Sequence, residues 1–256
     1  MEYFVGIDIG STSAKTVVLN REKQLLFTAA RPTGWSSVDT AEEIRSVLDE
    51  KGYLTDQTRC VATGYGRVSV PYAHKAVTEI TCHARGAVFL HNMQNFTVID
   101  IGGQDTKIIR VSDGMVSDFM MNDKCSAGTG RFLEMMANTL GLRPKELVEL
   151  AEKGSGVVIS SMCTVFAESE VISLIGRGES RENIASGVVN SIVSKVSSQA
   201  VKLSGAMQQV CLTGGLCSYA YIRDALSKAL GCPVYANENG QFAGAVGAAL
   251  SAFSIR

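Results

Sequence analysis

Two cysteines stand at similar places in the sequence, each just ahead of a predicted helix. Cys125 precedes a Gly-Thr-Gly turn at 128–130, and the helix-forming residues that follow, 131–136, have an apolar side. Cys163 opens a second predicted helix within the polar and small residues of 160–168. A helix N-terminus carries unpaired N–H groups and partial positive charge, which favour an anionic sulfur. Two such cysteines are half of what a four-thiolate metal site requires.

If Cys125 and Cys163 share one site, two more thiolates must come from elsewhere, and a two-fold homodimer supplies them most simply. The metal site then lies on the symmetry axis. The remaining cysteines are expected to be ordinary core or surface residues without a second thiol at metal-ligand spacing. They are Cys60, Cys82, Cys211, Cys217 and Cys232.

Composition excludes several classes of function. The chain has 256 residues and a net charge of −1, so its overall charge attracts neither nucleic acid nor an anionic membrane. Its first residues lack the basic and long apolar regions of a signal peptide, and no stretch approaches the roughly 18 apolar residues of a membrane span. Unpaired cysteines are typical of a reducing compartment, so we expect a cytoplasmic protein.

A strand–turn–strand unit occurs twice. Ile7-Asp8-Ile9-Gly10 is matched by Ile99-Asp100-Ile101-Gly102, and a lysine follows at the same spacing in both copies, Lys15 and Lys107. The repeat is too long for a solenoid, so it predicts an α/β chain of two similar lobes, residues 1–93 and 94–256. The glycine-rich turns of the two copies can face each other across a cleft and hold a nucleotide's phosphates between them.

Hydrophobic periodicity supplies the other elements. An antiparallel meander is expected over residues 3–30, and a small-residue helix at about 240–253 is suited to close packing and can pack back on the first lobe. Gly64-Tyr65-Gly66 lacks the third glycine of a dinucleotide fingerprint and is discounted. Helices are predicted at 39–48, 78–91, 144–153, 163–175, 182–204 and 219–230, and further strands at 59–63, 210–213 and 234–235.

Several motifs resemble a known superfamily and one family within it. GIDIGSTSAK, IDIGGQD and LTGGL are similar to the two phosphate motifs and the adenosine motif of the actin, sugar-kinase and Hsp70 superfamily, whose lobes are ribonuclease H-like. NDKCSAGTGRF, SSMCTVFAESE, VATGYGR and ITCHARG resemble, more narrowly, the ATP-dependent activators of 2-hydroxyacyl-CoA dehydratases and benzoyl-CoA reductases, the BadF/BadG/BcrA/BcrD-like ATPases. The similarity covers nearly the whole chain.

This resemblance implies a reductive activase. In that family a homodimer shares one [4Fe-4S] cluster, whose ligands match Cys125 and Cys163 of each subunit. The cluster is reduced by a ferredoxin or flavodoxin. ATP hydrolysis in the interlobe cleft then drives one electron to an iron–sulfur partner, which is a dehydratase, a benzoyl-CoA-type reductase or a double-cubane cluster enzyme.

The resemblance also assigns roles in the nucleotide site. Asp8 and Asp100 are expected to orient Mg²⁺ or its waters, since hard cations take carboxylate oxygen. Gln104 or Asp105 positions the attacking water. Lys15 is a candidate phosphate contact, although a solvated strand lysine explains it nearly as well. The residues expected to bind ATP or ADP are Gly10, Ser11, Thr12, Ser13, Ala14, Lys15, Gly102, Gly103, Gln104, Gly128, Gly130, Arg131, Gly214, Gly215 and Gln241.

Two other functions remain open from sequence. A small-molecule kinase of the same superfamily would use Asp100 or Asp105 as the general base for a substrate hydroxyl, although no sugar-binding insertion is visible. A non-enzymatic ATP-dependent scaffold, or a zinc-stabilised dimer, would use the cysteines structurally.

Overall fold

The computed structural model describes residues 2–161, 163–204 and 207–255. The chain forms two compact units. The first comprises Met1–Asn95, Val111–Ser117 and Asn239–Arg256, and the second comprises Phe96–Arg110 and Asp118–Glu238. The division into lobes at residue 93 stays a prediction.

The first unit contains a five-stranded sheet in the order β3-β2-β1-β4-β5. β1 runs antiparallel to β2, which runs antiparallel to β3, and this confirms the predicted meander. β4 joins the other side of β1 in parallel and is followed by the parallel β5. The bounds are Phe4–Ile9 (β1), Ser13–Leu19 (β2), Leu25–Pro32 (β3), Arg59–Thr63 (β4) and Lys75–Ala76 (β5).

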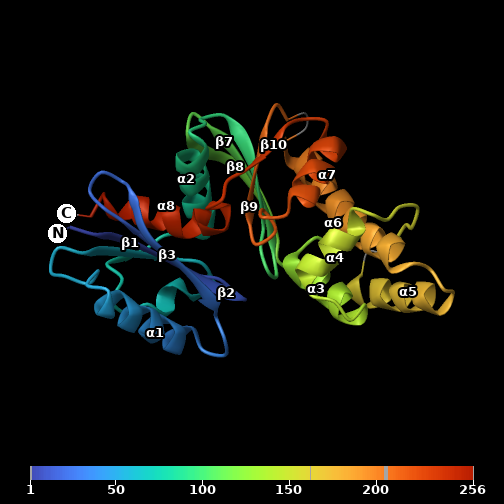
Figure 1. Cartoon of the computed structure of the whole chain (residues 1–256). Helices are drawn as coiled ribbons and strands as arrows, with labels where there is room; N and C mark the ends of the chain where they lie inside the picture. Colours follow the sequence, from blue (N-terminus) through green and yellow to red (C-terminus); the bar gives the residue numbers. More distant parts are fainter. Residues whose placement is uncertain (1, 162, 205–206, 256) are drawn as a thin grey trace. The chain divides into compact units, whose positions relative to one another are not determined.

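Helices cover both faces of this sheet (Figure 1). Successive strand residues point to opposite faces, so Val5 and Ile7 pack with α1 (Ser37–Glu50), whereas Phe4 packs with α8 (Ala243–Ala252). The second face is shared with α2 (Glu79–His91), and two short 3₁₀ helices complete the unit: η1 (Tyr65–Ser69) and η2 (Gly240–Phe242). Asp8 alternates with Ile7 and therefore lies on the α8 face.

Helix α8 packs so tightly that glycine is required at the contact points. A Cβ atom on Gly86 of α2 would collide with the carbonyl oxygen of Ala243, and one on Gly247 would collide with that of Cys82. Gly6 of β1 is likewise pressed against Ala245. The small residues of α8 thus allow three backbones to meet.

The sheet of the second part of the chain has the order β10-β9-β6-β7-β8. β9 lies between β6 and β10 and is parallel to both. A hairpin at Asp113-Gly114 joins β7 to β8, and these two residues have left-handed φ angles of 51° and 73°. The bounds are Phe96–Ile101 (β6), Thr106–Ser112 (β7), Met115–Asn122 (β8), Val210–Gly214 (β9) and Val234–Ala236 (β10).

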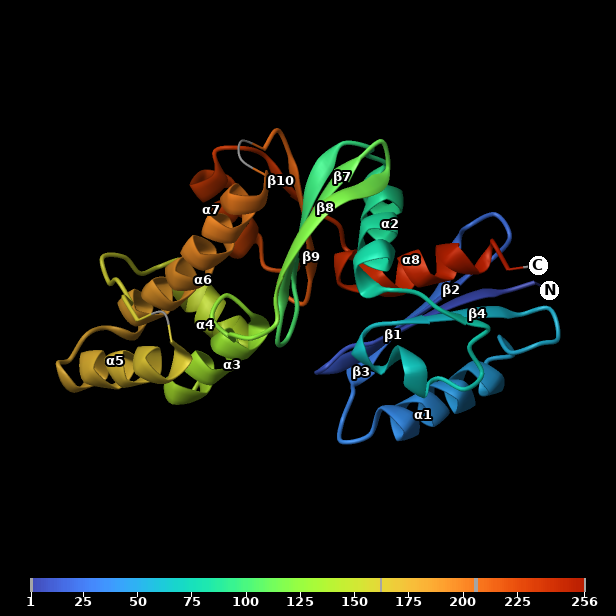
Figure 2. The same ribbon diagram turned by 180° about the vertical axis from the view of Figure 1, so that it is seen from behind.

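Five helices of the second unit share one large apolar core with this sheet, and Figure 2 shows them grouped together. Ile99 and Ile101 of β6 point into this core. Asp100 lies between them in sequence and so points to the opposite face. No helix in the described part of the chain is long and apolar enough to cross a membrane. The helices are α3 (Gly130–Thr139), α4 (Pro144–Ala151), α5 (Thr164–Gly176), α6 (Arg181–Ser204) and α7 (Ala220–Leu230).

The packing of α8 gives a stability prediction. Gly86→Ala should lower the free energy of unfolding by about 1–3 kcal/mol, because the added methyl group forces α2 and α8 apart. Gly176→Ala is the matched control, since a Cβ atom there meets nothing within 4 Å. Urea denaturation of both variants measures the difference, and equal midpoints would contradict the proposed backbone contact.

Candidate functional site

Asp8 is buried in β1, with 4% of its surface exposed. Glycines allow the chain to close around its carboxylate: a Cβ atom on Gly64 would lie 2.5 Å from Oδ1, and one on Gly244 would lie 2.5 Å from Oδ2. The Nε2 atom of buried His83 lies 3.9 Å from Oδ2. Lys15 is opposite Asp8 in the β1–β2 register and is half-buried.

Asp100 is the corresponding residue of β6 and is 2% exposed. The hydroxyl of Thr213 donates a 2.9 Å hydrogen bond to its Oδ1 atom. The Nζ atom of Lys107 lies 3.5 Å from Oδ2 of Asp100 and 2.7 Å from Oδ2 of Asp105. All four side chains are buried, so the lysine serves as a counter-ion for two carboxylates inside the protein.

Each aspartate also lies beside a Thr-Gly pair at the end of the neighbouring parallel strand. Thr63 pairs with Asp8 across β4 and β1, and Thr213 pairs with Asp100 across β9 and β6. Each threonine precedes a glycine with left-handed φ: 85° at Gly64 and 83° at Gly214. A Cβ atom at either glycine would approach the neighbouring aspartate. The duplication therefore includes the adjacent parallel strand and its Thr-Gly end.

The glycine-rich turns of the two copies are closed by the same backbone hydrogen bond. Gly10 N donates to Ser13 O at 3.1 Å, and Gly102 N donates to Asp105 O at 2.9 Å. Side chains at the tips remain accessible: Ser11, Thr12 and Gln104 are exposed. Polar groups that a ligand can reach thus stand beside each buried carboxylate, whereas Ala14 contributes its side chain to the core.

Helix α3 begins directly on the second turn. The backbone N–H groups of Gly130 and Arg131 donate to the carbonyls of Gly102 and Gly103, at 2.9 and 2.7 Å. Gly130 and Arg131, two of the residues expected to bind a nucleotide, thus donate their backbone N–H groups to the protein itself. Thr106 adds a third link, because its hydroxyl donates to Gly128 O at 2.8 Å.

Cys125 lies ahead of a helix, as the sequence predicts, and a turn separates it from the first helical residue. Helix α3 begins at Gly130 with Thr129 as its N-cap, so Cys125 lies in the preceding loop. The separation arises because Gly128 adopts a left-handed φ of 85° and the Thr129 hydroxyl donates to Ser126 O at 2.6 Å, which closes a turn before the helix. The Asn122 amide also donates to Cys125 O at 2.8 Å. The side chain of Cys125 is half-buried.

Cys163 does stand at a helix start, as predicted, and is exposed. It is the N-cap residue of α5, and its carbonyl accepts the first helical hydrogen bond from Ala167 N at 2.9 Å. The preceding segment is held by Glu170, whose carboxylate accepts hydrogen bonds of 3.1 Å from Ser160 N and Ser161 N. Burial raises the pKa of Glu170, but these bonds outweigh it and leave the pKa below its usual value.

The remaining five cysteines are buried. Burial raises the pKa of Cys60 and Cys211 to about 12 and that of Cys82 to about 11. A thiol must lose its proton to bind a metal. These three are therefore poor metal ligands, as expected from sequence.

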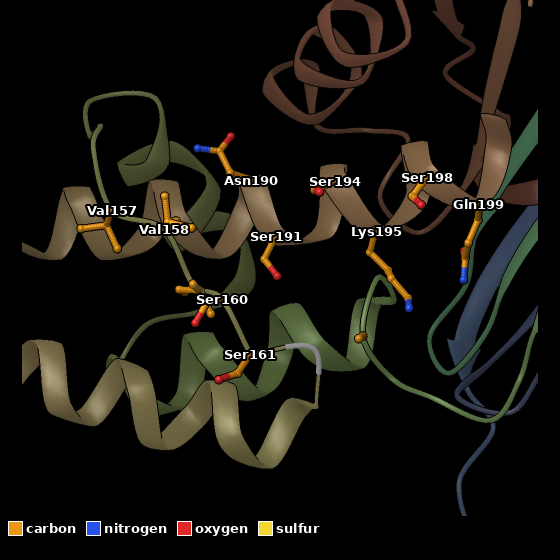
Figure 3. A pocket seen from close by; sticks show the side chains of 13 residues that line it. Val157, Val158, Ser160, Ser161, Asn190, Ser191, Ser194, Lys195, Ser198 and Gln199 are labelled. Atoms are coloured by element: carbon orange, nitrogen blue, oxygen red, sulfur yellow. The ribbon is translucent and has the colours of Figure 1, made fainter. Parts of the chain in front are cut away.

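A pocket of about 420 Å³ is lined in part by residues 157–161, which lead to Cys163. One wall is the polar side of α6, with Ser191 and Lys195, and the other includes Ser160 and Ser161 (Figure 3).

Gly214 and Gly215, predicted to contact adenosine, lie at and just after the end of β9 in the second unit, and Gln241 lies in η2 of the first.

Sequence reasoning missed three residues of the site: Thr63, Gly64 and Lys107. A signal for the first two existed, because Thr-Gly follows an apolar run at both 63–64 and 213–214. Lys107 was seen as part of the repeat but was given no role. Its contact with Asp105 depends on the conformation of the turn.

Comparison with known proteins identifies the family. The model of the BadF/BadG/BcrA/BcrD ATPase family matches residues 5–252. The chain belongs to this ATPase family.

Relatives within this family are similar over their whole length. The activator of lactoyl-CoA dehydratase from Anaerotignum propionicum is 43% identical over 254 residues, covering 98% of this chain and 97% of that protein. The crystal structure of component A of (R)-2-hydroxyglutaryl-CoA dehydratase from Acidaminococcus fermentans has a TM-score of 0.92 and 41% identity, covering 99% and 98%. The activator of 2-hydroxyisocaproyl-CoA dehydratase from Clostridium difficile, with bound ADPNP, has a TM-score of 0.90 and 37% identity, covering 98% and 94%.

A more distant likeness concerns the fold alone. A ROK family glucokinase from Streptomyces griseus, solved with glucose and AMPPNP, has a TM-score of 0.58 at 15% identity and covers 97% of this chain and 98% of its own. The predicted α/β fold of the actin, Hsp70 and sugar-kinase type is thereby confirmed.

The buried cluster of this BadF/BadG/BcrA/BcrD ATPase gives a second prediction. Lys107→Met should cost about 3–5 kcal/mol of folding free energy, because it leaves Asp100 and Asp105 buried without their counter-ion. The double variant Lys107→Met/Asp105→Asn should recover part of this loss, since one carboxylate is removed with the lysine.

Lys15→Met is the matched control for that experiment, because Lys15 occupies the same repeat position but is half-buried. It should cost less than about 1 kcal/mol. Guanidinium denaturation measures all three variants. A loss in Lys15→Met as large as that in Lys107→Met would refute the counter-ion role.

Proposed function

We propose that this protein is an ATP-dependent reductive activase. Two copies share one [4Fe-4S] cluster, ATP and Mg²⁺ bind at the duplicated turns, and a single electron passes to a 2-hydroxyacyl-CoA dehydratase or a related iron–sulfur enzyme such as a double-cubane cluster protein. A ferredoxin or flavodoxin in the cytoplasm supplies the electron. Support comes from relatives that are named activators of such dehydratases and from the arrangement of the cysteines.

The observation that carries the proposal is that the Cys125 and Cys163 segments lie close together. These are the cysteines with accessible side chains, and the residues that follow them, Ser126 and Thr164, are hydrogen-bonded to each other at 2.6 Å. Segments far apart in sequence therefore bring two reachable thiols into one region. That arrangement suits half of a four-thiolate site.

The donor set of one chain fits half a cluster. Cys125 and Cys163 offer two thiolates in each chain, and in the proposed dimer the second copy supplies the other two. Helix α5, which Cys163 caps, presents exposed apolar side chains that such a copy would cover. These are Val165, Phe166, Ile172 and Ile175. When bound, the cluster supplies one-electron chemistry at low potential.

The nucleotide site rests on the duplicated turns. Asp8 and Asp100 would hold Mg²⁺ or its waters through carboxylate oxygens. Ser11, Thr12 and the backbone amides of both turns would contact phosphate, with Gln104 positioned to orient water. A relative of 37% identity carries ADPNP, which supports nucleotide binding by this family member. Gly214 and Gly215 leave room for adenosine.

The second turn and the cysteine loop are directly connected, which supports coupling between ATP and the cluster. The hydrogen bonds from Gly130 and Arg131 to the Gly102–Gly103 carbonyls make the start of α3 an extension of the turn. A phosphate that moves the turn must move α3 and the Cys125 loop with it. The kinase alternative has less support, because Asp105, one candidate base, is paired with Lys107.

The cluster assignment predicts the effect of cysteine replacement. Cys125→Ser or Cys163→Ser should abolish the iron–sulfur signal of anaerobically reconstituted protein, because each removes two of the four thiolates in a dimer. Iron analysis and visible absorbance before and after dithionite provide the measurement. Cys60→Ser is the control and should retain the cluster, since Cys60 is buried elsewhere. Full iron retention in Cys163→Ser would contradict the proposal.

The nucleotide assignment is tested independently. Asp8→Ala or Asp100→Ala should remove Mg²⁺-dependent ATP hydrolysis without removing iron, because both carboxylates lie apart in sequence from the cysteine segments. Phosphate release and iron content are measured on the same samples. If hydrolysis survives both replacements, the catalytic cation is held elsewhere.

A further inference from the structure

A part-buried hydrogen bond joins the two cysteine segments within one chain. The hydroxyl oxygens of Ser126 and Thr164 lie 2.6 Å apart, and either can donate. Ser126 directly follows Cys125, and Thr164 directly follows Cys163. Thr164 is only 7% exposed, so little water competes for the bond. This contact lies one residue away from both candidate cluster ligands.

Each partner in this bond is anchored by contacts of its own. The Ser126 carbonyl accepts from the Thr129 hydroxyl, and the loop is held further by Asn122. Thr164 is the first residue of α5. The segment before it is fixed by the Glu170 carboxylate, which accepts from Ser160 N and Ser161 N. The Ser126–Thr164 bond therefore connects two pieces that are each internally fixed.

The same bond extends the contacts of the glycine-rich turn at 102–105. The turn's carbonyls hold the start of α3, and Thr106 holds Gly128 of the Cys125 loop at 2.8 Å. Through Ser126 these contacts continue to Thr164, next to Cys163. Hydrogen bonds joined by short stretches of backbone thus connect Gly102 to the residues next to both cysteines, and the last of these bonds is the Ser126–Thr164 pair.

We propose that Ser126 and Thr164 are positioning residues that fix the two cysteine segments of one chain as a single body attached to the Gly102–Gly103 turn. They do not touch iron; they hold the backbone from which both thiolates extend. The consequence for the cluster rests on the proposed function. The positioning itself is a property of the protein without metal.

A general stabilising contact would behave differently, and the chain offers a matched control. Thr139 and Glu168 also form a hydrogen bond between α3 and α5, at 3.1 Å, but neither is adjacent to a cysteine. If the Ser126–Thr164 bond served only to hold α3 against α5, removal of either bond would have the same effect. Thr164→Val and Thr139→Val each remove one hydroxyl at constant shape.

The first measurement uses the metal-free protein. Hydrogen exchange of peptides that cover residues 122–130 and 157–167 is followed by mass spectrometry in wild type, Thr164→Val, Thr164→Ser and Thr139→Val. We expect roughly fivefold faster exchange of both segments in Thr164→Val, the factor given by the usual net contribution of one hydrogen bond. Thr164→Ser keeps the hydroxyl and should match wild type. Thr139→Val should leave both segments unchanged.

The second measurement uses the reconstituted dimer. Removal of iron by bathophenanthroline should be several-fold faster in Thr164→Val and in Ser126→Ala than in wild type, with the rate restored in Thr164→Ser. Thr139→Val should lose iron at the wild-type rate even if its unfolding midpoint falls as far as that of Thr164→Val. That separation of cluster lability from stability distinguishes positioning from general support.

The outcomes separate the two proposals. If Thr164→Val exchanges and loses iron like wild type, or if Thr139→Val reproduces its behaviour, the positioning role is refuted while the cluster assignment stands. If wild type itself binds no iron, the proposed function fails, and the exchange experiment still decides whether the bond fixes the two segments.

Discussion

The fold depends on placing a carboxylate in the interior of each sheet. A buried charge costs several kcal/mol unless it is paired and hydrogen-bonded, so the surroundings of Asp8 and Asp100 are constrained. Glycine must follow the threonine of the neighbouring parallel strand in both copies, because a Cβ atom there would press on the aspartate. Thr213 and Lys107 satisfy Asp100 directly. The strand order places a Thr-Gly end beside each aspartate. It therefore determines the surroundings of the buried carboxylates as well as the packing of the apolar core.

The attachment of α3 to the second turn follows from a related constraint. A helix start has N–H groups without partners in the helix, and here two of them are satisfied by the turn's carbonyls. Gly130 permits this approach, since a Cβ atom there would already lie 3.2 Å from Gly102 O. The start of α3 is therefore attached to the turn, and the loop that carries Cys125 moves less freely than a loop before an unattached helix would. In the proposed function this rigidity transmits changes at the phosphate to the cysteines.

Much of this arrangement can be predicted from the sequence, and the exceptions have physical reasons. Apolar, β-branched runs broken by one aspartate identify β1 and β6, and the small residues of α8 indicate close packing. Cys163 was correctly placed at a helix start because no glycine or proline interrupts the twelve residues that follow it, 164–175. Cys125 was correctly expected just before a helix, but the shape of the turn at Ser126–Thr129 that separates it from α3 depends on a left-handed Gly128 and a side-chain hydrogen bond. Neither is visible in hydrophobic periodicity. The pairing of Lys107 with Asp105 was missed because it depends on how the turn folds back.

The two copies of the duplicated unit have diverged in charge, which gives their turns different tasks. The first copy has Ser13 where the second has Asp105, so Lys15 faces one acid whereas Lys107 faces two. Asp100, Asp105 and Lys107 together retain a net negative charge beside the Gly102–Gly103 turn. A phosphate placed directly against this cluster would be repelled. A divalent cation between them removes the repulsion. The first turn, with exposed hydroxyls and a half-buried lysine opposite Asp8 in the strand register, suits direct contact with phosphate. In the proposed site, a divalent cation beside Asp100 therefore lets the amides of the second turn approach phosphate, and the α3 start attached to that turn responds to what binds there.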